Sequence, residues 1–281
     1  MTSGRRNPRD RSTNLSAAGA IRLFSDYLQV TGVAHTGPEL QGDPHLIGKR
    51  LGLLNGSSWI TLWANYFGRI YLPGVHLVNA GNEAVQINFM EAHSAGLPSL
   101  PAANLSAFKR YAVDLAELGH VDAVLITCST MNRAYPHVSE ALQHYKVPVF
   151  QIDRPMMERA VNHGGRILVI ATHGPTVEST QTLLHEVAGE TGRSIHITGT
   201  LVEDAWDCLA RGDVENHNAI IARTIRDHMQ GEEIGCVVLA QLSMTIFLLS
   251  HPDPMKEFGI PVYTSGQCGF DAVREVLASK S

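Results

Sequence analysis

The chain has 281 residues, of which 44% are hydrophobic, and its formal net charge is −5. This length suits one large domain or two small ones, and an acidic chain has no overall attraction to nucleic acid or to an anionic membrane surface. The four cysteines include no Cys-x-x-Cys pair, so a zinc ribbon is excluded and a disulfide scaffold is disfavoured.

Residues 1–47 differ from the rest and are predicted to be an N-terminal extension. Their start is polar and rich in arginine, with no apolar stretch behind it, so it does not read as a secretory signal, and no later apolar run reaches the ~20 residues that span a bilayer. We therefore expect a cytoplasmic protein that contacts no membrane. An amphipathic segment follows, which we expect to pack on the body or in a homo-oligomer; the alternative is a basic arm for an anionic partner. Its apolar residues are Ile21, Leu23, Phe24, Tyr27 and Leu28.

From residue 48 onward, short apolar runs alternate with longer amphipathic segments. Several of the runs are continuously apolar, as in strands that are buried on both faces of a parallel sheet. This alternation predicts an α/β fold. Strands are predicted at 50–54, 75–78, 123–127, 148–150, 167–171, 195–198, 237–240 and 261–263. Helices are predicted at 58–69, 104–118, 133–144, 155–163, 176–190, 213–230 and 267–279.

The chain also repeats itself. Arg50 and Arg166 begin similar blocks 116 positions apart, while Cys128 and Gln241, like Pro148 and Pro261, are 113 positions apart. The repeat predicts two pseudo-symmetric lobes, each a parallel sheet flanked by helices, with an active site in the cleft between them. We expect the first lobe to span 48–151 together with a C-terminal helix at 265–281, and the second lobe to span 152–264.

Open parallel sheets bind ligands where their strands end, so the loops there carry the candidate chemistry. The first such loop is Cys128-Ser129-Thr130, which follows an apolar strand and precedes a predicted helix. A helix N-terminus would lower the pKa of the Cys128 thiol and favour the thiolate as a base or nucleophile. Ser129 and Thr130 would hold a carboxylate oxygen. A buried structural cysteine beside a helix cap is the alternative interpretation.

The other strand ends supply the remaining candidates. Gln241 is the positional partner of Cys128, and an amide there can hydrogen-bond but cannot act as a base. His173 is suited to transfer a proton near neutral pH, and Thr176 reads as the N-cap of the next helix. Further predicted binding residues are Asn55, Ser57, Ser58, Thr172 and Ser243, while Trp59, Trp63, Arg133 and Tyr135 flank the loops.

These blocks resemble the aspartate/glutamate/hydantoin racemase superfamily over most of residues 48–281. The resemblance rests on Cys128-Ser-Thr130, on Ala-Thr172 with Thr176-Val, and on a second strand-end block about 110 residues after the first cysteine. It implies a cofactor-independent enzyme, with no metal or nucleotide, in which a cysteine from each lobe flanks the α-carbon of a small carboxylate. By resemblance, Cys128 is the first-lobe cysteine, and the contacts to substrate come from Asn55, Ser57, Ser129, Thr130 and Thr172.

The chain departs from that pattern because Gln241 stands where the second-lobe cysteine is expected. Inversion needs an acid or base on each face of the α-carbon, so we expect one-sided chemistry by Cys128 with an isomerase or lyase outcome. Three alternatives remain: a true amino-acid or hydantoin-type racemase that uses His173 as the second acid or base, a non-catalytic small-ligand-binding module, and a site in which Cys268 supplies the second thiol. With no Arg or Lys in the loops, we expect a substrate with a neutral or apolar substituent.

Overall fold

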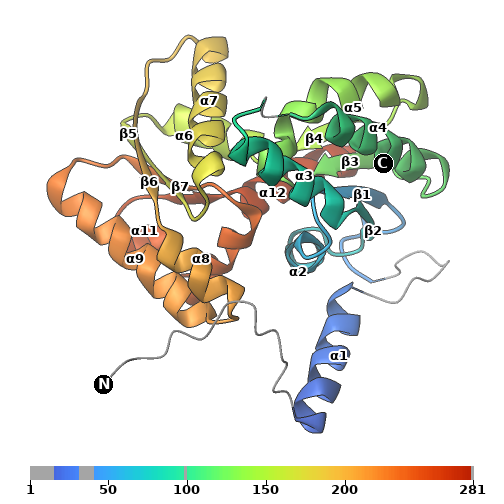
Figure 1. Cartoon of the computed structure of the whole chain (residues 1–281), viewed down its shortest axis with the longest axis horizontal. Coiled ribbons are helices and arrows are strands. Elements are labelled where there is room, and N and C mark those ends of the chain that lie inside the picture. Colours follow the sequence, from blue (N-terminus) through green and yellow to red (C-terminus); the bar gives the residue numbers. More distant parts are fainter. Residues whose placement is uncertain (1–15, 32–40, 98–99, 280–281) are drawn as a thin grey trace. The chain divides into compact units, whose positions relative to one another are not determined.

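The structure is a computed structural model in which residues 16–31, 41–97 and 100–279 are described (Figure 1). The chain forms two compact units, 1–36 and 37–281, which are treated separately. In the first unit, helix α1 (Ala17–Thr31) has no buried residue, and the apolar side chains predicted for its amphipathic segment are exposed. The second unit contains both sheets and all four apolar core clusters.

The second unit repeats one succession of elements. Its first half contains β1 (Arg50–Asn55), α2 (Ile60–Tyr71), β2 (His76–Gly81), α3 (Glu83–Ser94), α4 (Ala102–Glu117), β3 (Ala123–Ile126), η1 (Ser129–Ala134), α5 (Tyr135–Leu142), η2 (Gln143–Tyr145) and β4 (Val149–Gln151). Its second half contains α6 (Arg154–His163), β5 (Arg166–Ala171), α7 (Gly174–Thr191), β6 (His196–Leu201), α8 (Glu203–Ala210), α9 (Val214–Gly231), β7 (Cys236–Leu239), η3 (Leu242–Ile246), α10 (Phe247–Ser250), α11 (Pro254–Phe258), β8 (Val262–Thr264) and α12 (Ser265–Ser279).

The two sheets have the same topology, as the sequence repeat predicts. Each has four parallel strands, in the order β2-β1-β3-β4 and β6-β5-β7-β8. The backbone hydrogen bond that closes the central pair also recurs: Thr127 donates to the carbonyl of Leu54 (3.1 Å), and Ala240 donates to that of Ile170 (3.0 Å). The predicted α/β fold of two pseudo-symmetric lobes is therefore confirmed.

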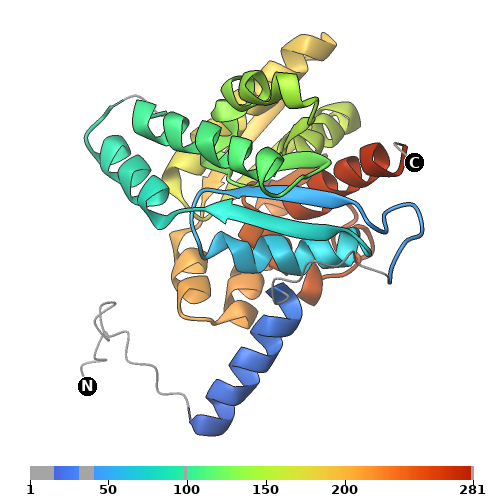
Figure 2. The same ribbon diagram turned by 90° about the vertical axis from the view of Figure 1, so that its right-hand side faces the viewer.

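The central strands are continuously apolar because helices cover both faces of each sheet. Successive side chains of a strand point to opposite faces, so Leu53 and Leu54 enter different core clusters, as do Val169 and Ile170 in the second lobe. In Figure 2 the first sheet lies between α2 and α4. Burial of both faces stabilises parallel pairing and brings the strand ends to one edge of each sheet.

The two lobes share part of their apolar core. Leu242 and Ile246, from η3 of the second lobe, belong to the same buried cluster as Phe67 of α2 and Phe270 of α12. Helix α12 lies between the sheets in Figure 1 and packs against both α2 and α6. This shared packing places the loop after β7 next to the first lobe.

All eight predicted strands are present, but four helices, α3, α8, α10 and α11, were not predicted. Of these, α3 and α8 occupy equivalent places, since α3 follows β2 and α8 follows β6. Among the described helices, none combines the length and apolar character needed to cross a membrane.

Candidate active site

Two matching turns leave the central strands of the sheets. After β3, Cys128 is extended (φ −102°, ψ 113°) and precedes the 3-10 turn η1. After β7, Gln241 has the same role (φ −135°, ψ 145°) and precedes η3. The pairing of Cys128 with Gln241 inferred from the sequence repeat is therefore a structural equivalence as well.

A cavity of about 290 Å³ is lined by both of these turns. Its walls come from both lobes, as predicted for the cleft between them. Seven of the predicted site residues line it: Cys128, Ser129, Thr130, His173, Thr176, Gln241 and Ser243. The other lining residues are Trp59, Ile60, Gln86, Met90, Thr127, Trp206 and Leu242.

The Cys128 thiol is nearly buried in the wall of this cavity. Its Sγ lies 3.1 Å from Oγ1 of Thr130, and the Gly56 backbone packs against it, since a Cβ on Gly56 would lie 2.5 Å from the sulfur. Burial raises the pKa of Cys128, against the lowering effect of hydrogen bonds from Thr130 and Met131. The prediction of a lowered pKa is thus wrong for the free protein, because loss of hydration outweighs the short η1 turn.

Gln241 is held in one orientation by Thr172. Its Oε1 accepts hydrogen bonds from the Thr172 backbone N–H (2.7 Å) and from the Thr172 hydroxyl (2.9 Å). Both bonds need an acceptor, so the carbonyl side of the amide faces Thr172 and the Nε2 group keeps its two N–H donors. Gln241 therefore presents a fixed hydrogen-bond donor at the place equivalent to the thiol.

His173 lies at the N-terminus of α7, as its N-cap residue. Its ring packs edge-on against Trp206, with centroids 6.4 Å apart. Burial lowers the pKa of His173, so the imidazole is neutral at pH 7. The predicted N-cap, Thr176, instead lies in the first turn, where its N–H donates to the His173 carbonyl (3.0 Å), because the helix already begins at Gly174.

Four predicted binding residues do not line the cavity. One of them, Asn55, is fully buried beneath it: its Oδ1 accepts from the Thr127 hydroxyl (2.6 Å) and its Nδ2 donates to Asn79 Oδ1 (3.0 Å). Since Thr127 does line the cavity, Asn55 supports the wall rather than forming it. Thr172 acts similarly, through Gln241.

The remaining two of the four are Ser57 and Ser58. Ser57 is fully buried, and its hydroxyl has no hydrogen-bond partner within the described part of the chain. Ser58 is exposed and donates through its N–H (2.9 Å) and its hydroxyl to the Glu83 carboxylate. The turn after β1 is therefore tied to the start of α3, and a substrate contact by either serine stays a prediction.

Three lining residues were missed because their helices were not predicted: Gln86 and Met90 of α3, and Trp206 of α8. Helix-start signals do precede both helices. Asn82 caps α3 by accepting from the Ala84 N–H (2.9 Å), and α8 begins with two acidic residues, which favour a helix N-terminus.

The other three cysteines are buried outside this cavity. Cys268 lies in an apolar cluster with Cys236, and burial raises the pKa of Cys268 to about 11 and that of Cys236 to about 12. The alternative in which Cys268 supplies a second thiol is therefore wrong, because its side chain belongs to the core of the second lobe. Cys208 and Cys236 are core residues, as expected.

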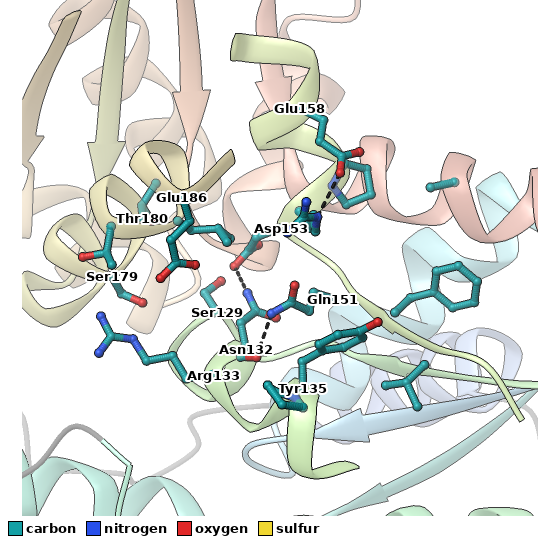
Figure 3. Close-up of a pocket in the computed structure, with 18 of the residues that line it drawn as sticks. Ser129, Asn132, Arg133, Tyr135, Gln151, Asp153, Glu158, Ser179, Thr180 and Glu186 are labelled. Carbon is teal, nitrogen blue, oxygen red and sulfur yellow. Dashed lines mark hydrogen bonds and ion pairs between the residues drawn. The ribbon is translucent and has the colours of Figure 1, made fainter. Parts of the chain in front are cut away.

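A larger cavity, of about 720 Å³, is lined by Ser129, Asn132 and Arg133 of the turn after Cys128 (Figure 3). Ser129 lines both cavities, whereas none of the three predicted catalytic residues lines the larger one. Its buried acid is Asp153, whose Oδ2 accepts from Asn132 Nδ2 (2.5 Å). Burial raises the pKa of Asp153 to about 7, although the Asn132 hydrogen bond and the hydroxyls of Ser129 and Ser265 oppose the shift. The smaller cavity, which is lined by all three predicted catalytic residues, is the candidate active site.

The comparisons with known proteins agree with this fold. The sequence model of the family described as Asp/Glu/Hydantoin racemase matches residues 88–273, while comparison with curated protein sequences gives no match. A glutamate racemase from Bacillus anthracis is similar over 83% of each chain, with 17% identity and a TM-score of 0.57. An allantoin racemase from Klebsiella pneumoniae (18% identity, TM-score 0.56) covers 83% of this chain and 89% of its own. The similarity to an unliganded arylmalonate decarboxylase (16% identity, TM-score 0.52) covers 82% of this chain and 92% of that chain.

Proposed function

Because this chain belongs to the Asp/Glu/hydantoin racemase family, we propose that it is a cofactor-independent enzyme acting at the α-carbon of a small carboxylate. The observation that carries the proposal is the pairing of Cys128 with Gln241. The two residues end equivalent strands of the two lobes and line one cavity. One face of a bound α-carbon would then meet a thiol, and the other a neutral amide, which gives one-sided chemistry with an isomerase or lyase outcome.

The state of Cys128 favours proton delivery. Its raised pKa keeps the sulfur protonated at neutral pH. In a decarboxylation, the bond from the α-carbon to a carboxyl group breaks, CO₂ leaves, and the electron pair stays on the α-carbon. Cys128 then transfers its S–H proton to that carbon, and the resulting thiolate regains a proton from water. The same transfer completes an isomerisation in which another group removes the first proton.

Gln241 is proposed to hold the substrate carboxylate. Its Nε2 donors are directed away from Thr172, since both Thr172 bonds are made to Oε1. Hydroxyls of Ser129, Thr130 and Ser243 line the same cavity. Donors already fixed in place stabilise the negative charge that develops on the carboxylate as the carbanion forms, which is usually the largest contribution in such reactions.

A true racemase that uses His173 is the second candidate, and one observation favours it. The His173 ring lines the same cavity as Cys128, and its lowered pKa leaves a neutral imidazole that accepts a proton. His173 would remove the α-proton from one face while the Cys128 thiol delivers a proton to the other, which inverts the configuration.

The test measures turnover in D₂O by NMR, with phenylmalonate as a probe of CO₂ loss and with alanine and aspartate as probes of α-hydrogen exchange. We expect Cys128→Ser to lower the rate at least ~100-fold, because a hydroxyl is a far weaker acid than a thiol. Cys208→Ser is the matched control, since Cys208 is buried outside the cavity.

The outcomes separate the candidates. Turnover by Cys128→Ser close to that of the wild type would reject Cys128 as the catalyst. A loss of exchange with His173→Gln, together with retained CO₂ release, would assign His173 to the removal of the α-proton. Tight binding of these acids without any turnover by the wild type would instead indicate the non-catalytic binding module.

A further inference from the structure

The walls of the candidate active site carry aromatic rings and neutral polar groups. Of the residues that line it, none is Asp, Glu, Lys or Arg. Its one titratable ring, His173, has a lowered pKa and is uncharged at pH 7. A carboxylate on the α-carbon's substituent, such as the side-chain carboxylate of aspartate, would therefore lose its hydration without gaining a counter-charge. The substituent that this cavity accepts without that penalty is uncharged.

Two tryptophans, one from each lobe, meet at this cavity. Trp59 immediately precedes α2, and Trp206 belongs to α8. Their ring centroids are 5.7 Å apart and the ring planes are inclined at 65°, an edge-to-face arrangement. Because Trp206 also packs against His173, the aromatic wall adjoins a residue of the proposed reaction site. Both rings line the cavity.

We propose that the substrate carries an aromatic substituent on its α-carbon, and that Trp59 and Trp206 are the residues that select it. This inference rests on the proposed function for the position of the α-carbon. An edge-to-face pair leaves ring surface open for a third ring, which packs there in an offset or edge-on geometry. The carboxylate lies toward the donors of Gln241 and Ser243, and the ring lies against the tryptophans.

The cavity size agrees with a substrate of this class. Its volume of about 290 Å³ is at the lower end of ligand pockets, on the order of 300 Å³, which suits an acid with a single ring. Apolar side chains of Ile60, Met90 and Leu242 complete the walls. An aromatic ring there replaces water with carbon contacts, whereas a charged substituent would meet only apolar and neutral groups.

Binding is measured by calorimetry with three probes: phenylacetate, cyclohexylacetate and succinate. The Cys128→Ala variant serves as background, so that turnover does not interfere. We expect phenylacetate to bind at least ~10-fold more tightly than succinate, and Trp206→Leu or Trp59→Leu to weaken phenylacetate about 10-fold, which is the scale of one aromatic pair. Cyclohexylacetate, which lacks the ring electrons, should bind more weakly than phenylacetate.

Leu62→Ala is the matched control, because Leu62 is a partly exposed apolar residue of α2 that does not line the cavity. It should leave the affinity for phenylacetate unchanged. Intrinsic fluorescence gives a second readout, since two of the three tryptophans of the chain line the site, and phenylacetate should change the emission of the wild type.

Three results would overturn the inference. They are binding of succinate as tight as that of phenylacetate, wild-type affinity in both tryptophan variants, and no binding of phenylacetate at millimolar concentration. Aromatic binding that depends on Trp59 and Trp206 supports the substrate class even if the Cys128→Ser experiment rejects Cys128 as the catalyst. Failure of the proposed function and failure of this inference are thereby distinguished.

Discussion

The thiol of Cys128 lies where it does because residue 56 has no side chain. A Cβ there would be 2.5 Å from Sγ and 2.9 Å from Cβ of Cys128, well inside the contact distance of a carbon and a sulfur atom. Position 56 is also buried, so a larger residue cannot turn outward. The backbone after β1 thus packs directly against the sulfur of Cys128, which follows β3.

We expect Gly56→Ala to displace the Cys128 side chain and to lower turnover at least ~10-fold, since misplacement of a reacting group by about 1 Å costs more than that. The control is Gly189→Ala on the exposed face of α7, where a Cβ meets nothing within 4 Å. That variant should be fully active and about 1 kcal/mol more stable, because alanine favours a helix. Full activity of Gly56→Ala would refute the role given to this glycine.

His217 of α9 is a second residue whose burial has a measurable consequence. It is fully buried, and neither ring nitrogen has a hydrogen-bond partner in the described residues. Burial lowers the pKa of His217 from 6.5 to about 4. Between these pH values the unfolded chain binds the proton and the folded protein does not, so this group makes the free energy of unfolding rise with pH across that window.

We expect His217→Leu to remove this contribution, which is at most about 3 kcal/mol. Urea unfolding at a series of pH values between 4 and 7 measures it. The matched control is His137→Gln, a substitution of an exposed histidine in α5, which should leave the pH profile as it is in the wild type. An unchanged profile for His217→Leu would contradict the assignment.

The segment between β4 and α6 connects three elements through Asp153. Its Oδ2 accepts a hydrogen bond from Asn132 of η1, and the hydroxyls of Ser129 and of Ser265 at the start of α12 lower the pKa of the carboxyl group. Gln151 Nε2 donates to the Asn132 carbonyl (2.8 Å). The turn η1, which follows Cys128, is therefore held by hydrogen bonds to Gln151 of β4 and to Asp153 of the segment after β4.

Asp153 has an effect on stability opposite to that of His217. Its pKa rises from 3.8 to about 7 on folding, so the folded protein holds a proton that the unfolded chain has released. This contribution is present below pH 3.8 and is lost as the pH rises through 7. It amounts to at most about 4 kcal/mol, and between pH 4 and 6.5 it opposes the effect of His217.

Asp153→Asn should remove the loss of stability between pH 4 and 7, because an amide needs no proton and its oxygen still accepts from Asn132. We expect the variant to unfold at higher urea concentration than the wild type at pH 8, and to show stability that rises from pH 4 to 6.5, since the lowered pKa values of the buried His217 and His173 are then no longer opposed by Asp153. Glu158→Gln, an exchange on the exposed side of the same cavity, is the control. Equal urea midpoints for Asp153→Asn and the wild type at pH 8 would rule out the assignment.

Both sheets and all four apolar clusters lie within residues 37–281. A chain that begins at Gly37 should therefore fold, with a melting temperature within a few degrees of that of the whole protein and with the same turnover. Calorimetry and the NMR assay measure both quantities. A truncated chain that fails to fold would show that residues 1–36 contribute to the core of the larger unit.

The likeness of the two lobes makes their differences informative. Besides Cys128 and Gln241, the positions of Asp153 and Gly266 are 113 apart, and both follow the last strand of their sheet. In the second lobe Gly266 donates its N–H to Thr245 Oγ1 (3.1 Å), and a Cβ at 266 would lie 2.5 Å from that oxygen. The thiol of Cys128 and the buried carboxyl group of Asp153 thus have no counterpart at the repeat-related positions, which are occupied by Gln241 and Gly266.

Hydrophobic patterning in the sequence was enough to predict the eight strands, the two lobes and the loops that meet between them. Those features follow from local periodicity and from the repeat, because burial on both faces of a strand leaves a continuous apolar run. The equivalence of Cys128 and Gln241 could be predicted from the same sequence repeat. Seven predicted residues do line one cavity, since the ends of parallel strands share an edge of the sheet.

Other properties arose only when distant segments came together. Met90 reaches the cavity from α3, whose amphipathic pattern is weak, and Trp206 reaches it from α8, which has only 8 residues. Asn55 supports a wall through Thr127. The pKa of Cys128 rises although a nearby helix start suggested the opposite, because hydration is lost to side chains far away in sequence. The charge state and the exposure of a group depend on the atoms that surround it in the folded structure. Its neighbours along the chain are not sufficient to predict them.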